Sequence, residues 1–178
     1  MKLVVGLGNP GKEYARTRHN VGWQILDLLA GEEHWQTSAK AGAAYIKTEL
    51  NKTRVELLKP TVFMNNSGQA VAYAVKKHKL ALANIIVIHD DKDIPLGETR
   101  VQKGRGAAGH NGVQSIISHL GANDFWRVRV GVAPVDRPLG NTADFVLGRL
   151  MSAEQKILKD VFTNVINEIT KLVSTDHA

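Results

Sequence analysis

Ile85-Ile-Val-Ile-His-Asp-Asp91 is the strongest strand signal in the chain, and the fold class is predicted from it. Its unbroken β-branched run is typical of a strand buried on both faces, as at the centre of an α/β sheet. The run then turns abruptly acidic at Asp90 and Asp91. Ligands of open α/β sheets bind beyond the carboxyl ends of the strands, so this acidic end is predicted to lie at a binding site.

Strand and helix patterns alternate on both sides of this run. Leu3-Val4-Val5 predicts a short buried strand, and the runs 43–50 and 54–59 around Asn51-Lys52 predict a hairpin. Further strands are expected over 99–102 and over 126–132, where basic and apolar side chains alternate, and a turn containing Pro95 is expected over 91–97. Helices are expected over 20–30, from Asn66 or Ser67, and over 113–120, and the first of them has the inner stripe Val21, Ile25, Leu28 and Leu29. A capping-box pattern at Ser152 opens a last helix, whose inner residues are Leu158, Val161, Val165, Ile169 and Leu172. The fold class is therefore α/β: a single domain, 1–178, with a mixed twisted sheet and helices on both faces.

Composition narrows the class of protein. The absence of cysteine excludes disulfides, thiol nucleophiles and Cys-based zinc sites. No apolar run is long enough to span a membrane, and the N-terminal apolar stretch is too short for a signal peptide, so we expect a cytoplasmic protein without membrane contact. A net charge of +6 suits an acidic partner such as nucleic acid, although many small enzymes are equally basic.

The loop Gly6-Leu-Gly-Asn-Pro-Gly11 satisfies the G-x-G-x-x-G spacing of dinucleotide-binding proteins. That fingerprint requires a helix directly after the loop, to meet the pyrophosphate, and an acidic residue at the end of a second strand. Here the helix pattern begins nine residues later, and Asp27 lies inside it. We therefore expect no dinucleotide and no other cofactor.

Two His-Asn pairs, His19-Asn20 and His110-Asn111, stand beside glycine at the head of predicted helices. The positive end of a helix dipole disfavours a protonated imidazole, and a neutral imidazole is what a general base requires. For either histidine alone, a bond to a local carbonyl is the simpler interpretation.

The acidic run His89-Asp90-Asp91-Lys92-Asp93 leaves three interpretations open: a hard-metal site, a carboxylate that orients a histidine, or a solvated turn. Neighbouring strand residues point to opposite faces, which disfavours the metal site. Without cysteine or a G-x-S-x-G elbow, hydrolysis would use water activated by histidine. Loop amides at Asn9, Asn65 and Asn111 are candidate donors to a carbonyl or to that water.

These segments together resemble the bacterial-type peptidyl-tRNA hydrolase family, in order and over essentially the whole chain. The matching motifs are GLGNPG with Tyr14 and Thr17-Arg-His-Asn20, Lys59-Pro, Phe63-Met-Asn65 with Ser67-Gly68, His89-Asp90, Asp93-Ile-Pro, Leu96-Gly, Gly109-His-Asn-Gly112 and Val146-Leu-Gly148. Three positions depart from the family pattern: Val62, Ala108 and Ala133. Of these, Ala108 bears on the loop before His110, where glycine is usual.

The resemblance implies an enzyme that cleaves the ester between a peptide and the terminal ribose of tRNA, recycling tRNA for translation. It implies His19 as the base that activates water, Asp90 as the carboxylate that holds its imidazole, and Asn9 as the residue that distinguishes N-blocked from free aminoacyl groups. The implied substrate contacts are Tyr14, Phe63, Asn65 and Asn111, with Met64 and His110 close to the site.

The partner implied is peptidyl-tRNA, met at its acceptor stem and terminal ribose. Basic side chains supply phosphate contacts that ignore base sequence, and the candidates are Arg100, Lys103, Arg105, Arg127 and Arg129. We expect a monomer without metal. The alternatives are a non-catalytic RNA-binding protein of the same fold and, on the acidic run, a metal-dependent nucleotide hydrolase.

Overall fold

A computed structural model describes residues 1–135 and 140–175. Its centre is a seven-stranded sheet in the order β2-β3-β4-β1-β5-β7-β6. Four consecutive strands are parallel to one another: β4 (Thr53–Pro60), β1 (Lys2–Gly6), β5 (Ile85–Pro95) and β7 (Trp126–Ala133). The outer strands β2 (Gln36–Ser38), β3 (Ala43–Leu50) and β6 (Thr99–Lys103) pair antiparallel. The mixed α/β sheet predicted from the sequence is therefore confirmed.

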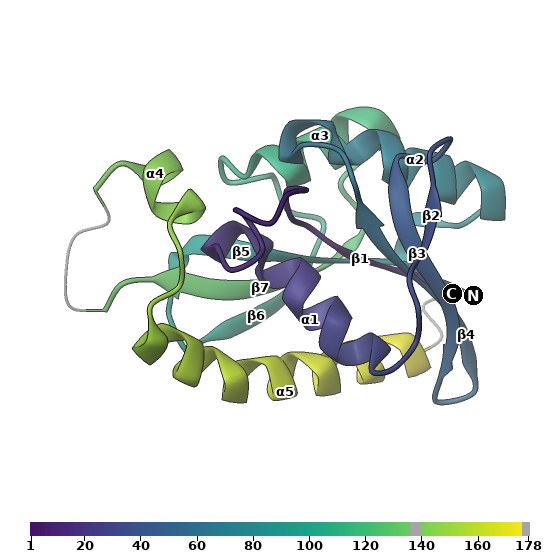
Figure 1. Ribbon diagram of the computed structural model, residues 1–178. Coiled ribbons are helices and arrows are strands. Elements are labelled where there is room, and N and C mark those ends of the chain that lie inside the picture. Colours follow the sequence, from purple (N-terminus) through teal and green to yellow (C-terminus); the bar gives the residue numbers. More distant parts are fainter. Residues whose placement is uncertain (136–139, 176–178) are drawn as a thin grey trace.

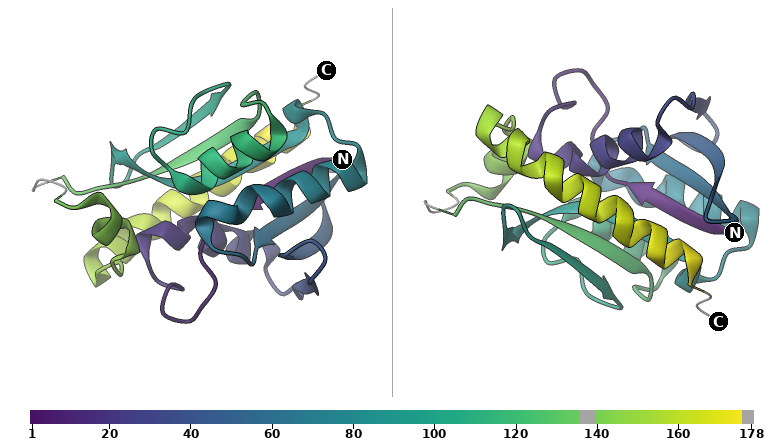
Figure 2. Two further views of the ribbon diagram at one scale, coloured as in Figure 1. Left: turned by 90° about the horizontal axis from the view of Figure 1, so that it is seen from above. Right: turned by 90° about the horizontal axis from the view of Figure 1, so that it is seen from below.

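Helices cover both faces of the sheet (Figures 1 and 2). On one face lie α1 (Val21–Ala30) and α5 (Ser152–Ser174), and on the other lie α2 (Ser67–His78) and α3 (Asn111–Leu120). The short α4 (Thr142–Leu147) stands off the sheet at one end of the molecule (Figure 1). Three single 3-10 turns complete the described elements: η1 (Arg18–Asn20), η2 (Met64–Asn66) and η3 (Leu82–Asn84).

Strand β5 is buried on both faces, as its sequence predicts. Ile86 and Ile88 belong to the core under α1 and α5, whereas Ile85 and Val87 belong to the core under α2 and α3. Because side chains alternate along a strand, Asp90 continues the first set and Asp91 the second. This alternation separates two adjacent carboxylates at the edge where the site lies.

Several local predictions need correction. Leu28, expected on the inner stripe of α1, is 57% exposed, and Leu26 is buried in its place. The expected turn over 91–97 is strand as far as Pro95, with a register shift that follows Asp91. The capping residue of α5 is Met151 rather than Ser152: its N–H donates to Glu154 at 2.7 Å. Strand β2 and helix α4 were not predicted.

No helix among the described residues has the length and apolar character of a membrane span.

Candidate active site

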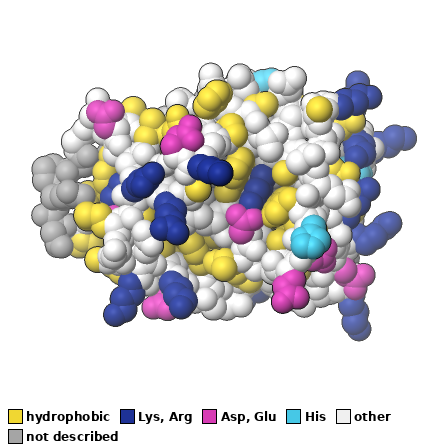
Figure 3. Space-filling model, viewed as in Figure 1, with side chains coloured by type: hydrophobic (Ala, Val, Ile, Leu, Met, Phe, Trp, Pro, Cys, Tyr) yellow, Lys and Arg dark blue, Asp and Glu magenta, His cyan; other side chains and the backbone are white. Residues whose placement is uncertain are grey.

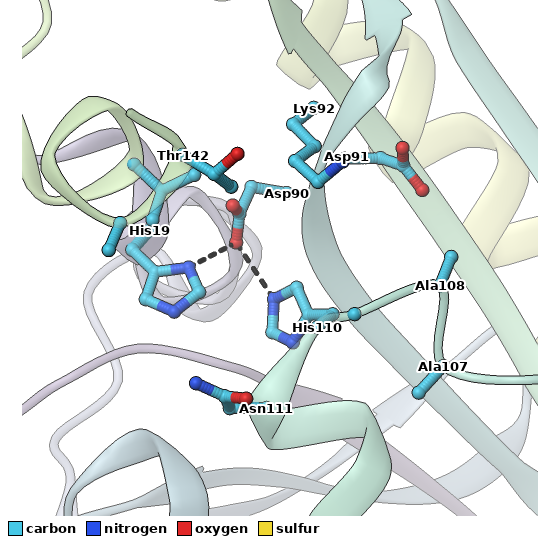
Figure 4. Close-up of a pocket in the computed structure, with 12 residues that line it drawn as sticks. His19, Asp90, Asp91, Lys92, Ala107, Ala108, His110, Asn111 and Thr142 are labelled. Carbon is cyan, nitrogen blue, oxygen red and sulfur yellow. Dashed lines mark hydrogen bonds and ion pairs between the residues drawn. The ribbon is translucent and has the colours of Figure 1, made fainter. Parts of the chain in front are cut away.

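A cavity of about 210 Å³ opens at the carboxyl end of β5 (Figure 4). The η1 turn, the end of β5, the loop before α3 and the helix α4 all contribute to it. It is lined by His19, Asp90, Asp91, Lys92, Ala107, Ala108, Gly109, His110, Asn111, Thr142, Ala143 and Val146. Four residues predicted for the site, His19, Asp90, His110 and Asn111, are thus brought together from three distant parts of the chain.

Asp90 lies between two imidazole rings. One carboxylate oxygen, Oδ1, is 2.8 Å from Nδ1 of His19 and 2.9 Å from Nε2 of His110. Burial by itself would raise the pKa of this carboxyl, which is only 2% exposed, but the two histidines outweigh it and hold the pKa of Asp90 well below its usual range. Asp90 is therefore an anion that can only accept hydrogen bonds.

The ionised state of Asp90 fixes the proton on each ring. Nδ1 of His19 donates to Asp90, so when this ring is neutral its Nε2 carries a lone pair. His110 has the opposite tautomer: its Nε2 donates to Asp90, and its Nδ1 accepts the N–H of Val113 at 3.3 Å as the N-cap of α3. Both nitrogens of His110 are thus engaged within the protein, and of the two rings on Asp90 only His19 keeps an unused basic nitrogen.

Close backbone packing brings His19 to this position. A Cβ on Gly6 would lie 2.4 Å from the carbonyl oxygen of Gly22, and a Cβ on Gly22 would lie 2.5 Å from the N of Leu7. These two glycines therefore let the first turn of α1 touch β1 directly. Gly6 of the GLGNPG loop therefore serves helix–strand contact, and the turn that precedes α1 presents His19 to the end of β5.

Asn20 fixes the backbone of Asn9 from both sides. Its Oδ1 accepts the N–H of Asn9, and its Nδ2 donates to the carbonyl of Asn9, both at 2.9 Å. The side-chain oxygen of Asn9 accepts the N–H of Met64 at 2.8 Å. With its oxygen engaged, the amide NH₂ is the part of Asn9 left to donate to a substrate.

A third histidine lies beneath His110. The rings of His89 and His110 meet edge to face with 4.7 Å between centroids, and Nδ1 of His89 bonds the carbonyl of Asp90 at 2.7 Å. Desolvation, together with the charge of His110, lowers the pKa of His89 well below its usual value. His89 therefore stays neutral and supports His110 as a packed ring. In the sequence, His89 stood out only as a member of the acidic run and of the His89-Asp90 motif.

The basic face of β7 is turned inward, which corrects one prediction. Arg127 is 1% exposed and its guanidinium donates to the carbonyls of Arg105 and Gly106, so it organises the loop before α3 instead of meeting phosphate from the surface. Arg129 is 3% exposed and pairs with Asp91 at 2.7 Å and with Gln102. A phosphate contact by Arg129 would require it to exchange one of these partners.

The other predicted residues lie outside the lining of this cavity. Phe63 is 58% exposed and Asn65 is exposed, while Tyr14 is half-buried and Met64 is buried. Arg100, Lys103 and Arg105 are exposed. Ala108 lines the cavity with a φ of 50°, a left-handed conformation that suits the glycine usual in the family. The loop therefore keeps a glycine-like shape in spite of its methyl group.

The wall formed by α4 was missed. Thr142, Ala143 and Val146 face the cavity from this helix. Its six residues are too few to show a helical period, but Asn141 caps it, accepting the N–H groups of Ala143 and Asp144 at 3.0 and 3.2 Å. The N-cap type of residue at Asn141 was the one available signal.

A metal ion could be held by one group among the described residues: His19, Asp90 and His110, whose ligand atoms lie within 4.8 Å of one another. The acidic run itself does not converge, because Asp91 turns to Arg129 and Asp93 pairs with Lys92 at the surface.

The protein is of the α/β class and has an imidazole–carboxylate pair at the carboxyl edge of its sheet. The peptidyl-tRNA hydrolase family model matches residues 3–178. A peptidyl-tRNA hydrolase of Geobacter metallireducens is 42% identical over 174 residues, covering 97% of this chain and 88% of the relative. One of Mycolicibacterium vanbaalenii is 42% identical over 176 residues, covering 97% of this chain and 90% of the relative.

The crystal structure of peptidyl-tRNA hydrolase from Acinetobacter baumannii superposes with a TM-score of 0.89 at 32% identity, covering 97% of this chain and 88% of that one. The chain therefore belongs to the peptidyl-tRNA hydrolase family, whose members are carboxylic ester hydrolases.

Proposed function

We propose that this protein hydrolyses the ester bond between a peptidyl or N-blocked aminoacyl group and the terminal ribose of tRNA, releasing the peptide and a tRNA free for reuse in translation. Membership of the family supports the substrate class. The residues that would perform the reaction are supported by the geometry of the cavity.

One observation carries the assignment of the base: Asp90 meets Nδ1 of His19 but Nε2 of His110, which corresponds to opposite tautomers of the two rings. His110 uses one nitrogen for Asp90 and the other for the N–H of Val113. His19 uses only Nδ1, so its Nε2 can take a proton from water. Asp90 holds the ring in this tautomer and stabilises the imidazolium that forms.

The reaction then proceeds by water addition. His19 Nε2 removes a proton from water as the oxygen attacks the ester carbonyl, and a tetrahedral oxyanion results. The same proton passes from the imidazolium to the ribose oxygen as the C–O bond breaks, giving a carboxylic acid and a free hydroxyl. Amide N–H donors at Asn9 and Asn111 are suited to stabilise the oxyanion or to position the water.

Substrate contacts follow from exposure and donor groups. We assign to Asn9 the distinction between blocked and free amino groups, because its NH₂ can donate to the acyl carbonyl of a blocked group. Tyr14, Phe63 and Asn65 are proposed contacts on the route to the cavity, and the exposed ring of Phe63 can stack on a base or an apolar side chain.

Phosphate contacts are assigned to the exposed residues Arg100, Lys103 and Arg105. Figure 3 shows further basic side chains gathered at the edge of the molecule where α2 and the β3–β4 hairpin end, and exposed residues of these elements include Lys52, Arg54, Lys76, Lys77 and Lys79. This distribution supports RNA binding without base specificity. The proposal also includes that the protein acts as a monomer in the cytoplasm.

The test is release of N-acetylated amino acid from charged tRNA, compared with the unblocked ester and with His19→Ala. We expect the wild type to cleave the blocked ester preferentially, and His19→Ala to lose turnover by about 1,000-fold because general-base catalysis is removed. Binding of tRNA should persist in the variant. Near-normal turnover by His19→Ala would reject the base, and tRNA binding without hydrolysis by the wild type would favour the non-catalytic RNA-binding alternative.

A further inference from the structure

The residues just before His19 are joined to the segment that links α4 to α5. The N–H of Arg18 donates to the carbonyl of Gly148 at 3.2 Å, and the N–H of Leu150 donates to the carbonyl of Arg16 at 2.9 Å. Thr17 and Arg149 form an antiparallel bridge between these two bonds. The turn that presents His19 is thus attached to the chain on the far side of the cavity wall.

The side chain of Arg18 strengthens this attachment from inside. Its Nη2 lies 2.7 Å from both carboxylate oxygens of Glu154, and its Nη1 donates to the carbonyl of Phe145 at 3.2 Å. The guanidinium also lies over the ring of Phe145, 4.3 Å from the centroid. Arg18 is 5% exposed and Glu154 is 7% exposed. Such a two-pronged, desolvated pair fixes geometry more strictly than a surface ion pair does.

Glycine at position 148 is required for this contact. A Cβ there would lie 2.8 Å from Nη1 of Arg18. Glu154 in turn accepts the N–H of Met151 at 2.7 Å and so begins α5. Arg18 therefore holds both ends of one segment, the last turn of α4 and the first turn of α5.

The segment held in this way is a wall of the cavity. Thr142, Ala143 and Val146 of α4 line it. Figure 4 shows Thr142 on the same side as His19. Helix α4 has only six residues and stands off the sheet, so it cannot be kept in place by its own propensity or by a broad packing face. Its position depends on the contacts at Phe145, Gly148 and Glu154.

We propose that Arg18 is a positioning residue that fixes the α4 wall against the site and thereby sets the affinity for the acyl part of the substrate. This inference rests on the proposed function. Arg18 does not touch the reacting groups: Asp90 holds His19, and the N–H of Val113 holds His110. Loss of the Arg18 contacts should therefore weaken substrate binding and leave the chemical step in place.

The variant that isolates this role is the double substitution Arg18→Met/Glu154→Gln. Removing Arg18 alone would leave the Glu154 carboxylate buried without its partner and could prevent folding. Met keeps the apolar bulk of the arginine stem, and Gln keeps an acceptor for the N–H of Met151. The double variant thus removes the tether while both the packing and the helix cap remain.

In steady-state hydrolysis of N-acetyl-aminoacyl-tRNA, the double variant should have a KM raised about tenfold and a kcat within about threefold of wild type. The reason is that the lost contacts stabilise the bound substrate and the transition state equally. Arg18→Lys should have a KM between those of the wild type and the double variant, since lysine keeps the positive charge but not the planar guanidinium with its several donors. Amide hydrogen exchange of residues 142–147 should accelerate in the double variant, a readout independent of turnover.

The matched control is Glu56→Gln, which disturbs another buried pair, Glu56 with His78 at 2.9 Å between β4 and α2. It should leave KM unchanged. The inference is overturned if the double variant keeps the wild-type KM, if only kcat falls, or if exchange in α4 is unaltered. A wild-type protein without ester hydrolysis would instead contradict the proposed function, and the exchange result would still decide whether Arg18 holds α4.

Discussion

Asp90 and Asp91 are adjacent on β5 and both are buried, yet they have different partners. Asp90 faces the cavity and accepts hydrogen bonds from two imidazoles, at 2.8 and 2.9 Å. Asp91 points to the other side of the strand, where its carboxylate meets Nε of Arg129 at 2.7 Å and the N–H of Asp93 at 2.9 Å. Figure 4 shows the two side chains turned apart.

The two partners determine whether a buried carboxylate can take part in proton transfer. A guanidinium keeps its proton at any physiological pH, so the Asp91–Arg129 pair can hold a shape but cannot exchange a proton with a substrate. An imidazole gains and loses protons near neutral pH. In the proposed mechanism, Asp90 therefore stabilises the charge that forms on His19.

The largest expected effect contrasts the two residues by the same substitution. Asp90→Asn should lower kcat by about 1,000-fold, because the amide keeps an acceptor oxygen but loses the charge that stabilises the His19 imidazolium. Asp91→Asn should lower kcat by no more than about tenfold, since it alters a contact outside the imidazole pair. The measurement is hydrolysis of N-acetyl-aminoacyl-tRNA, with folding checked by circular dichroism. Equal losses of kcat in the two variants would contradict different roles for Asp90 and Asp91.

A second comparison uses stability. Arg129→Met leaves Asp91 buried without its cation and should lower the free energy of unfolding by about 3 kcal/mol. The double substitution Arg129→Met/Asp91→Asn should recover most of that loss, because the uncompensated charge is gone. Urea denaturation of the two variants beside the wild type measures this. If the single and double variants were equally unstable, the charge of Asp91 would not be the cause.

The third comparison separates the imidazoles from the carboxylate by pH. His89 has a lowered pKa and is neutral when folded, but in the unfolded chain it takes a proton below about pH 6.5. The unfolded state then binds more protons, so stability should fall by about 2 kcal/mol between about pH 7 and pH 5. His89→Gln should flatten this decline, as measured by urea denaturation at both pH values.

The contribution of Asp90 has the same sign in a lower window. Its pKa is also lowered, so the stability it supplies is complete above the ordinary carboxyl pKa of about 4 and is lost only as the pH falls below that value. A decline between about pH 7 and pH 5 that persists unchanged in His89→Gln would assign the acid sensitivity to other groups.

The central elements of the fold could be predicted from the sequence because their pattern of hydrophobic residues is strong. The β-branched run 85–88, the turn Asn51-Lys52 and the inner stripe of α5 through Leu158, Val165 and Ile169 were all predicted and are confirmed. Two peripheral elements could not be predicted in this way. Strand β2 has three residues and helix α4 has six, which is too short for the two-residue period of a strand or the 3.6-residue period of a helix to be recognised.

Four residues of the cavity, and the contact between His19 and Asp90, were predicted from the sequence, whereas the contact of Asp90 with His110 was not. Two His-Asn pairs beside glycine marked His19 and His110, yet nothing in the sequence says that one carboxylate oxygen would meet both rings. The basic alternation of β7 was also visible, but whether Arg127 faced solvent depended on the loop that folds over it. Contacts between distant segments are set by tertiary packing, which local patterns do not encode.

The proposed function requires that Asp90 prepares His19, and not His110, to act as a base. The most direct test is the ¹⁵N NMR spectrum of the imidazole nitrogens at neutral pH, assigned with His19→Gln and His110→Gln. We predict that neutral His19 carries its proton on Nδ1 and His110 on Nε2. A neutral His19 protonated on Nε2 would contradict this assignment, because the nitrogen that is not bonded to Asp90 could not then accept a proton.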